Sequence, residues 1–275
     1  MEAKINQYLN QSLSENQILL QHPSKFTTST GKLKGPLGDL GMFSKGTTVP
    51  VWKPSANHST DRNRDGNGSE IDITRVCTIR INCPSSLIHR IWFDKHGDRK
   101  QWDDRTCLDS EKIQSFEGDG DSIGPTNMYW LISQPKPMIS PRDFIYAYKE
   151  VPTNKTNERL YVGCSCDGIE GLGGVNGMNE SQTKQSNDAV RGWLQGLFRI
   201  QEVGPNMCDV TYCLRVKPKG SLVKSVAVLV ANELVYTLFN LRQKVEAMFQ
   251  ARIRKRKKKK KKKKAAMKKQ VLSKL

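Results

Sequence analysis

Long apolar runs are missing from this 275-residue sequence. The most apolar stretch, Val226–Phe239, includes Asn232 and Glu233 and is shorter than the about 20 residues that a membrane-spanning helix needs. The first residues, MEAKINQYLNQSLSENQ, are polar and lack the apolar centre of a secretory signal. We therefore expect a cytoplasmic protein with neither a membrane-spanning helix nor an export signal.

Residues that commonly bind metal ions are few or poorly spaced. The four histidines are scattered, and the seven cysteines include no Cys-x-x-Cys pair, so we expect no metal and no cofactor, and reduced, mostly buried thiols. Residues 61–72 partly resemble a calcium-binding loop, but its twelfth position is Asp72 instead of the usual glutamate. A polar run precedes it and a predicted strand follows, so we interpret this segment as a loop without calcium.

Catalytic motifs are also absent. No Ser/His/Asp or Cys/His set and no pair of carboxylates stands in a recognisable context. The stretch GIEGLGGVNG at 168–177 has neither the Gly-x-Gly-x-x-Gly spacing nor the Lys-Ser/Thr ending of a nucleotide-binding loop. We therefore expect a binding protein and not an enzyme.

Acidic residues are missing from residues 252–275, which hold 15 of the 45 Lys and Arg side chains. Residues 1–251 carry 30 basic and 27 acidic groups and are almost neutral. We therefore do not expect the surface of the folded body itself to bind nucleic acid. Repulsion within the unbroken basic run Arg254–Lys264 predicts a tail that is largely disordered.

Apolar periodicity predicts an α+β fold. Strict alternation over residues 71–82 is typical of a half-buried strand, and further strands are predicted over 48–52, 128–134, 144–151, 159–166, 192–203 and 208–216. Helices are predicted over 1–20, 84–96 and 221–251, and the last has an apolar residue at every third or fourth position. Antiparallel strands closed by one long amphipathic helix indicate a curved sheet with the helix lying across it. That helix would cover either an ordinary core or a cavity.

Four segments, in this order, resemble a known family. They are DRKQWD (98–103), MYWLISQPKPMISPRDF (128–144), GWLQGLFRI (192–200) and KPKGS (217–221). Together they are similar to the START domain, a helix-grip lipid-binding module, and to its phosphatidylcholine-transfer branch in particular. The resemblance implies residues 1–41 as an N-terminal helix and loop, 42–251 as the START-like domain and 252–275 as the basic tail. It further implies a monomer that encloses one phospholipid, phosphatidylcholine by preference, in a tunnel under the C-terminal helix and transfers it between membranes.

The resemblance also implies how the phosphate is held. Arg99 stands at the position of the family's head-group arginine, whose planar guanidinium can donate two parallel hydrogen bonds to phosphate. Asp103 matches the family's aspartate. Four residues apart on a helix, the two would share a face, and Asp103 would keep Arg99 paired when phosphate is absent. From these residues alone, a surface ion pair is the alternative.

The remaining ligand contacts are carried by aromatic residues. Trp130, Phe144 and Trp193 stand where the family encloses the quaternary ammonium of choline, which is recognised by the faces of aromatic rings. Gln195 matches a polar head-group contact, and Phe93 stands where a tyrosine would reach toward phosphate. Phe93 and Phe144 both replace tyrosines of the family pattern, which leaves phosphatidylethanolamine, a sterol or ceramide open as ligands. The three rings could alternatively be core.

Three interpretations of the basic tail stay open. It could attract the anionic surface of a cytoplasmic membrane leaflet, with the protein peripheral at that membrane. It could act as a nuclear address or bind nucleic acid without sequence preference. It could also be an expansion of lysine codons without a selected role. The first interpretation fits a lipid-transfer protein best, because lipid extraction begins with contact between the protein and the membrane.

Overall fold

The computed structural model describes residues 7, 9–10, 26–29, 51–54, 73–117, 124–135, 139–166, 189–220 and 224–272. Its elements are β1 (Phe26–Ser29), β2 (Val51–Pro54), β3 (Ile73–Ile81), α2 (Ser85–His89), the π-helix η3 (Arg90–Asp94), the 3₁₀ helix η4 (His96–Gln101), β4 (Cys107–Phe116), β5 (Thr126–Ser133), β6 (Arg142–Val151), β7 (Glu158–Ser165), β8 (Val190–Arg191), β9 (Trp193–Gly204), β10 (Met207–Lys217) and α4 (Lys224–Leu272). The predicted calcium-like loop and most of the predicted N-terminal helix lie outside the described residues.

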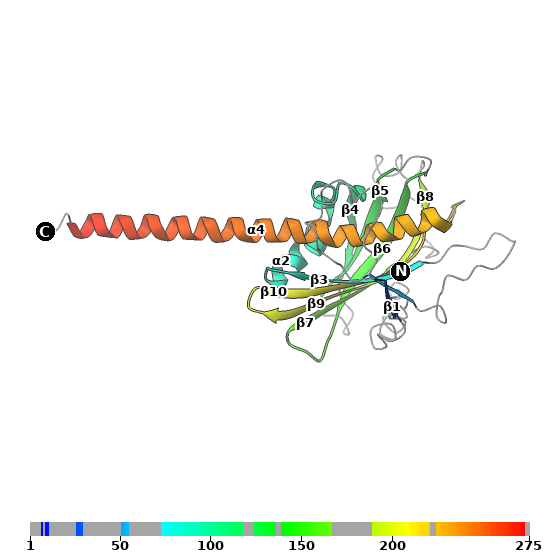
Figure 1. Cartoon of the computed structure of the whole chain (residues 1–275), viewed down its shortest axis with the longest axis horizontal. Helices are drawn as coiled ribbons and strands as arrows, with labels where there is room; N and C mark the ends of the chain where they lie inside the picture. Colours follow the sequence, from blue (N-terminus) through cyan, green and yellow to red (C-terminus); the bar gives the residue numbers. More distant parts are fainter. Residues whose placement is uncertain are drawn as a thin grey trace.

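The strands form one ten-stranded sheet in the order β1-β2-β3-β10-β9-β7-β6-β5-β4, with β8 parallel to β6. All other pairings are antiparallel, as the alternating segments predicted. α4 lies across this sheet and then continues far beyond it (Figure 1). The predicted α+β architecture is therefore confirmed.

Both faces of the sheet carry apolar side chains. Because successive residues of a strand point to opposite faces, Tyr129 and Leu131 of β5 belong to the cluster under α4, whereas Met128 and Trp130 belong to a cluster on the opposite face. The N-terminal Leu9 is packed into this second cluster and is fully buried. We call the face under α4 the inner face and the other the outer face.

The helical segment after β3 and the strand β4 both differ from the sequence-based prediction. The segment predicted as one helix over 84–96 is a short α-helix followed by a π-helix, in which the consecutive residues Ile91, Trp92 and Phe93 are all buried. The wider π turn brings more of the circumference onto the sheet than an α-helical stripe would. The strand β4 was missed because its sequence, CLDSEKIQSF, is mostly polar and half-exposed at the edge of the sheet.

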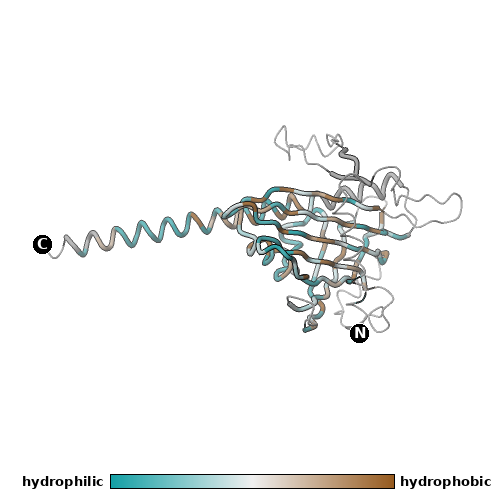
Figure 2. The backbone as a smooth tube through the Cα atoms, turned by 90° about the horizontal axis from the view of Figure 1, so that it is seen from below, coloured by the Kyte–Doolittle hydropathy of each residue, from teal (hydrophilic) through white to brown (hydrophobic). Residues whose placement is uncertain are grey.

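The basic tail is not disordered in this structure, contrary to the prediction. α4 runs without interruption from Lys224 to Leu272, through the whole lysine run. A helix that is already formed on the body extends at low cost, because nucleation is the expensive step and lysine is a good helix former. Figure 2 shows that hydrophilic residues predominate on the part that projects from the body. Among the described residues, no helix has both the length and the hydropathy for crossing a bilayer.

Candidate functional site: a cavity under α4

A cavity of about 80 Å³ lies between the inner face of the sheet and α4. Most of its wall is formed by aromatic and aliphatic side chains. The non-aromatic polar side chains in the wall are Arg99, Thr106, Ser133 and Thr237. Arg99 comes from η4, Ser133 from β5 and Thr237 from α4, so three separate elements contribute to the polar part. Such a cavity suits a ligand with one polar group and a larger apolar part.

Arg99 and Asp103 form a buried ion pair, and not the surface pair that the residues alone left open. Nε of Arg99 donates to Oδ2 of Asp103 over 2.9 Å, and the two residues are 8% and 0% exposed. Burial is the largest single influence on Arg99 and would lower its pKa, but the Asp103 carboxylate, together with the neighbouring Tyr146, Cys107 and Tyr212, outweighs it, so the pKa of Arg99 is raised. Arg99 therefore keeps its positive charge inside the body.

Helix α4 supplies further partners to this pair. Thr237 Oγ1 donates to Oδ2 of Asp103 over 3.1 Å and accepts from Nη2 of Arg99 over 3.3 Å. Nδ2 of Asn240, one turn later, donates to Oδ1 of Asp103 over 2.8 Å. No hydrogen bond from Nη1 of Arg99 is found among the described residues, although the guanidinium lines the cavity. Arg99 thus has donor capacity left for an anionic group of a ligand.

Aromatic rings form much of the remaining wall. Three of them, Phe144, Tyr146 and Tyr148, come from alternate positions of β6, and Trp92 and Tyr212 complete the set. Burial raises the pKa of Tyr146, Tyr148 and Tyr212 above the usual value, so these phenols stay neutral and can donate hydrogen bonds. The guanidinium of Arg99 lies 5.2 Å from the centre of the Trp92 ring, a cation–π distance.

The structure brings only some of the predicted contacts together. Arg99 and Phe144 line the cavity, and Asp103 holds Arg99. Phe93 is buried beside them in the inner cluster, where its ring stacks on Tyr161 at 3.9 Å between centroids. It is not part of the cavity wall among the described residues.

The predicted aromatic enclosure of Trp130, Phe144 and Trp193 is not formed. Trp130 is fully buried in the outer cluster, with the sheet between it and the cavity. Trp193 and Gln195 share a strand face with the outer residue Leu197, whereas Leu194 lines the cavity. The Trp193 ring lies instead beside two cations, Arg215 at 5.7 Å and Lys217 at 5.3 Å. The physical reason is the two-residue period of a strand: a shift of one position moves a side chain to the other face.

Sequence reasoning missed Tyr146, Tyr148 and Tyr212 as wall residues. A signal for the first two was present, because Phe144, Tyr146 and Tyr148 alternate along one predicted strand and must share a face. Thr237 and Asn240 were also missed, since polar residues in an amphipathic helix are usually assigned to its solvent side.

The cysteines are free thiols, as predicted. All seven are buried, and burial raises the pKa of the Cys83 and Cys208 thiols to about 12. No group of His, Cys, Asp and Glu suited to a metal ion occurs within the described part of the chain. The calcium-like loop at 61–72 lies outside that part.

Comparison with known proteins gives matches at the level of structure. No family model matches the sequence, and no curated protein matches it either. Among solved structures, human STARD10 has a TM-score of 0.56 and 18% identity, over 84% of this chain and 77% of that one. Human StAR-related lipid transfer protein 5 has a TM-score of 0.58 and 10% identity, over 91% and 99% of the two chains.

A bacterial structure shares the same architecture. The STAR-related lipid transfer protein of Xanthomonas axonopodis has a TM-score of 0.51 and 15% identity, over 80% of this chain and 98% of that one. At such identities the likeness concerns the fold, and it agrees with the antiparallel sheet and the covering C-terminal helix described above. The chain has the helix-grip fold of the START-related lipid transfer domains.

Proposed function

We propose that this protein binds one phospholipid molecule under α4 and transfers it between membranes. The observation that carries the proposal is the charged, buried Arg99 in the polar part of an otherwise aromatic and aliphatic cavity. A phosphate diester is the group of a lipid that needs such a cation, and the planar guanidinium is the side chain best matched to it. Asp103 would hold the guanidinium in place, as its 2.9 Å hydrogen bond indicates.

Phosphatidylcholine is the proposed ligand. With Trp130 and Trp193 on the outer face, its ammonium group would be received by the rings that do line the cavity, Phe144 and Tyr146 of β6 among them. A quaternary ammonium cannot donate hydrogen bonds and is stabilised by ring faces, at about 0.5–2 kcal/mol for each ring. The described wall therefore offers what both charged groups of the phosphocholine head require.

Lipid entry requires α4 to move. The cavity of about 80 Å³ is well below the roughly 300–1,000 Å³ of ordinary small-molecule pockets, so on this proposal it must enlarge before a phospholipid fits, and we call the present arrangement the closed state. The projecting basic part of α4 is proposed to contact the anionic surface of the membranes between which lipid moves. Each Lys or Arg near such a surface contributes about 1 kcal/mol of attraction.

The test is native mass spectrometry of the full-length protein after incubation with vesicles that contain phosphatidylcholine, phosphatidylethanolamine, cholesterol and ceramide. The wild type should carry one phosphatidylcholine, and Arg99→Ala should carry none. The matched control is Arg191→Ala. Arg191 donates from Nε and Nη2 to the two carboxylate oxygens of the buried Asp143 on the outer side, over 2.9 and 2.7 Å. Its replacement also removes an arginine paired with a buried aspartate, but away from the cavity, and should leave lipid loading unchanged.

A second variant separates loss of binding from loss of folding. Arg99→Met combined with Asp103→Leu removes both buried charges together, which is often neutral for stability, yet it should still abolish phospholipid loading. A cholesterol or ceramide adduct that survives Arg99→Ala would replace phospholipid as the ligand class. A wild type that takes no lipid would refute the proposal.

A further inference from the structure

The hydroxyl of Thr237 has no hydrogen-bonding capacity to spare. It has one hydrogen, which it donates to Asp103, and it accepts from Nη2 of Arg99. Its 3.1 Å contact with Thr106 Oγ1 must therefore be donated by Thr106, because a hydroxyl has one donor and two acceptor positions. Thr237 is also fully buried. One side chain of α4 thus joins three groups on the body.

Asn240 strengthens this attachment from the next turn of the helix. Its hydrogen bond to Oδ1 leaves Asp103 bound through both carboxylate oxygens to α4. We call the contacts of Thr237 and Asn240 with Arg99 and Asp103 the latch. The latch connects α4, the helix that covers the cavity, directly to the arginine that is proposed to hold phosphate.

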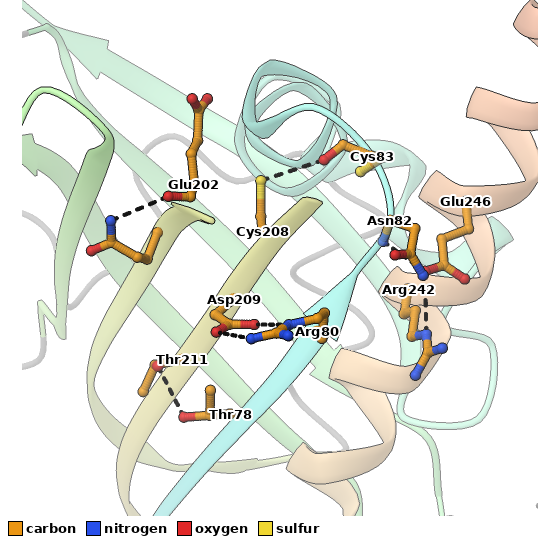
Figure 3. Close-up of polar contacts among 11 residues, drawn as sticks. Thr78, Arg80, Asn82, Cys83, Glu202, Cys208, Asp209, Thr211, Arg242 and Glu246 are labelled. Carbon is orange, nitrogen blue, oxygen red and sulfur yellow. Dashed lines mark hydrogen bonds and ion pairs between the residues drawn. The ribbon is translucent and has the colours of Figure 1, made fainter. Parts of the chain in front are cut away.

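A second attachment lies where α4 leaves the body. Oε1 of Glu246 accepts from the backbone N and from Nδ2 of Asn82, at 2.7 and 3.0 Å, and lies 3.3 Å from Nε of Arg242 (Figure 3). Val245, next to it, is fully buried against the inner cluster. We call this attachment to the end of β3 the clamp.

Beyond the clamp, the same helix becomes an exposed basic arm. The described side chains of residues 250–267 are exposed apart from the half-buried Ile253, and they include the run Arg254–Lys264. The arm, the clamp and the latch belong to one uninterrupted helix (Figure 1). At 1.5 Å per residue, the arm from the clamp to Leu272 is about 39 Å long and the distance from the clamp to Thr237 about 13 Å.

We propose that α4 works as a lever, in which contact of the basic arm with an anionic membrane surface opens the latch and gives lipid access to the cavity. A tilt of about 15° around the clamp moves Thr237 by roughly 3.5 Å at a helical rise of 1.5 Å per residue, enough to break hydrogen bonds of about 3 Å. This inference rests on the proposed lipid binding. It adds that the closed state is released at the latch and that contact of the basic arm with the membrane releases it.

The latch also connects opening to ligand binding. Nη2 of Arg99, which now donates to Thr237, becomes free for a phosphate oxygen when α4 tilts. A bound phosphate then competes with Thr237 for this donor and keeps the latch open until the lipid leaves. Membrane contact and head-group binding therefore favour the same position of the helix.

The experiment compares Thr237→Val, alone and combined with Asn240→Leu, with the wild type as full-length proteins. Transfer of fluorescent phosphatidylcholine is measured between phosphatidylcholine vesicles with and without about 20 mol% phosphatidylserine, a lipid that gives the surface negative charge. The wild type should transfer faster with phosphatidylserine. The variants should be faster than wild type without it, on the order of tenfold for the loss of a hydrogen bond to a charged group, and should depend little on surface charge.

The matched control is Thr211→Val. Thr211 is equally buried and forms a hydroxyl pair with Thr78 at 2.9 Å between β10 and β3, away from the cavity (Figure 3). This variant loses a threonine hydroxyl in the same way and should transfer like the wild type. Transfer by Thr237→Val that is as slow and as charge-dependent as that of the wild type would overturn the lever.

Amide hydrogen exchange gives a readout that does not depend on transported lipid. Vesicles with phosphatidylserine should increase exchange of the wild-type segment around Thr237 and Asn240, and neutral vesicles should not. An increase without any lipid loading would refute the proposed function and retain the lever. Lipid loading without such an increase would refute the lever and retain the proposed function.

Discussion

At the residue scale, the decisive feature is the buried ion pair of Arg99 and Asp103, which is also proposed to hold the ligand's phosphate. A buried pair is often no more stabilising than apolar residues of similar volume, because both charges lose their hydration. Here Asp103 accepts hydrogen bonds from Arg99, Thr237 and Asn240, so its loss would leave a buried cation without its counter-charge. The pair is therefore sensitive to removal of one member and much less to removal of both.

Asp103→Ala should lower the free energy of unfolding by about 3–5 kcal/mol, the usual result of breaking a buried pair. The double variant Arg99→Met, Asp103→Leu should unfold within about 2 kcal/mol of the wild type, because it leaves no uncompensated charge. Urea titration followed by tryptophan fluorescence measures both. If Asp103→Ala lowers the free energy of unfolding by less than the double variant does, Arg99 is hydrated and not buried as the structure has it.

At the scale of elements, the aromatic wall depends on two glycines, one in the neighbouring strand β7 and one between β8 and β9. A Cβ atom at Gly163 of β7 would lie 2.4 Å from Cε1 of Tyr148, and one at Gly192 would lie 2.4 Å from Cε1 of Phe144. Both distances are far below van der Waals contact, so the rings of β6 would have to move. The absence of side chains at these two positions is what allows large rings to lie along the inner face.

Gly163→Ala should therefore destabilise the protein by about 1–3 kcal/mol, the range for an overpacked core, and should reduce lipid loading because Tyr148 lines the cavity. Gly204→Ala at the end of β9 is the control, since its Cβ would meet only the flexible Met207 side chain, at 3.4 Å. Thermal unfolding should place this control within about 0.5 kcal/mol of the wild type. Equal effects of the two substitutions would contradict the packing argument.

At the scale of the whole molecule, charge is separated from the body. The basic arm continues the helix α4 that covers the sheet of the nearly neutral body, so membrane attraction is concentrated at one end of an elongated molecule (Figure 2). The run Arg254–Lys264 has no apolar face, which distinguishes it from interfacial helices that insert into a bilayer. Its attraction to an anionic surface should therefore be mainly electrostatic and should weaken with salt.

Replacement of the eight residues Lys257–Lys264 by glutamine should abolish sedimentation with phosphatidylserine vesicles, whereas replacement by arginine should preserve it. Both variants keep the chain length, and both residues are good helix formers. Raising the salt concentration should release the wild type. Undiminished vesicle binding by the glutamine variant would refute the role of the arm, and displacement of the wild type from vesicles by a small amount of single-stranded RNA would favour the nucleic-acid interpretation.

Much of this molecule follows from its sequence alone. The strands predicted over 71–82, 144–151 and 192–203 correspond to β3, β6 and β9, and the alternation of apolar and polar residues over 71–82 is what indicated the first of them. The spacing of Arg99 and Asp103 was sufficient to predict that they would pair. The composition alone separated the neutral body from the basic end.

Only the tertiary structure decided which strand face is the inner one, since a strand with two apolar faces gives no indication of it. For that reason Trp130 and Trp193 lie outside the cavity, and Tyr146 and Tyr148 lie within it. The structure also decided that the basic tail is helical, because a helix already nucleated on the body can extend through residues that would not nucleate one. The position of Thr237 and Asn240 over the buried ion pair is likewise a result of docking between distant segments, which no local pattern records.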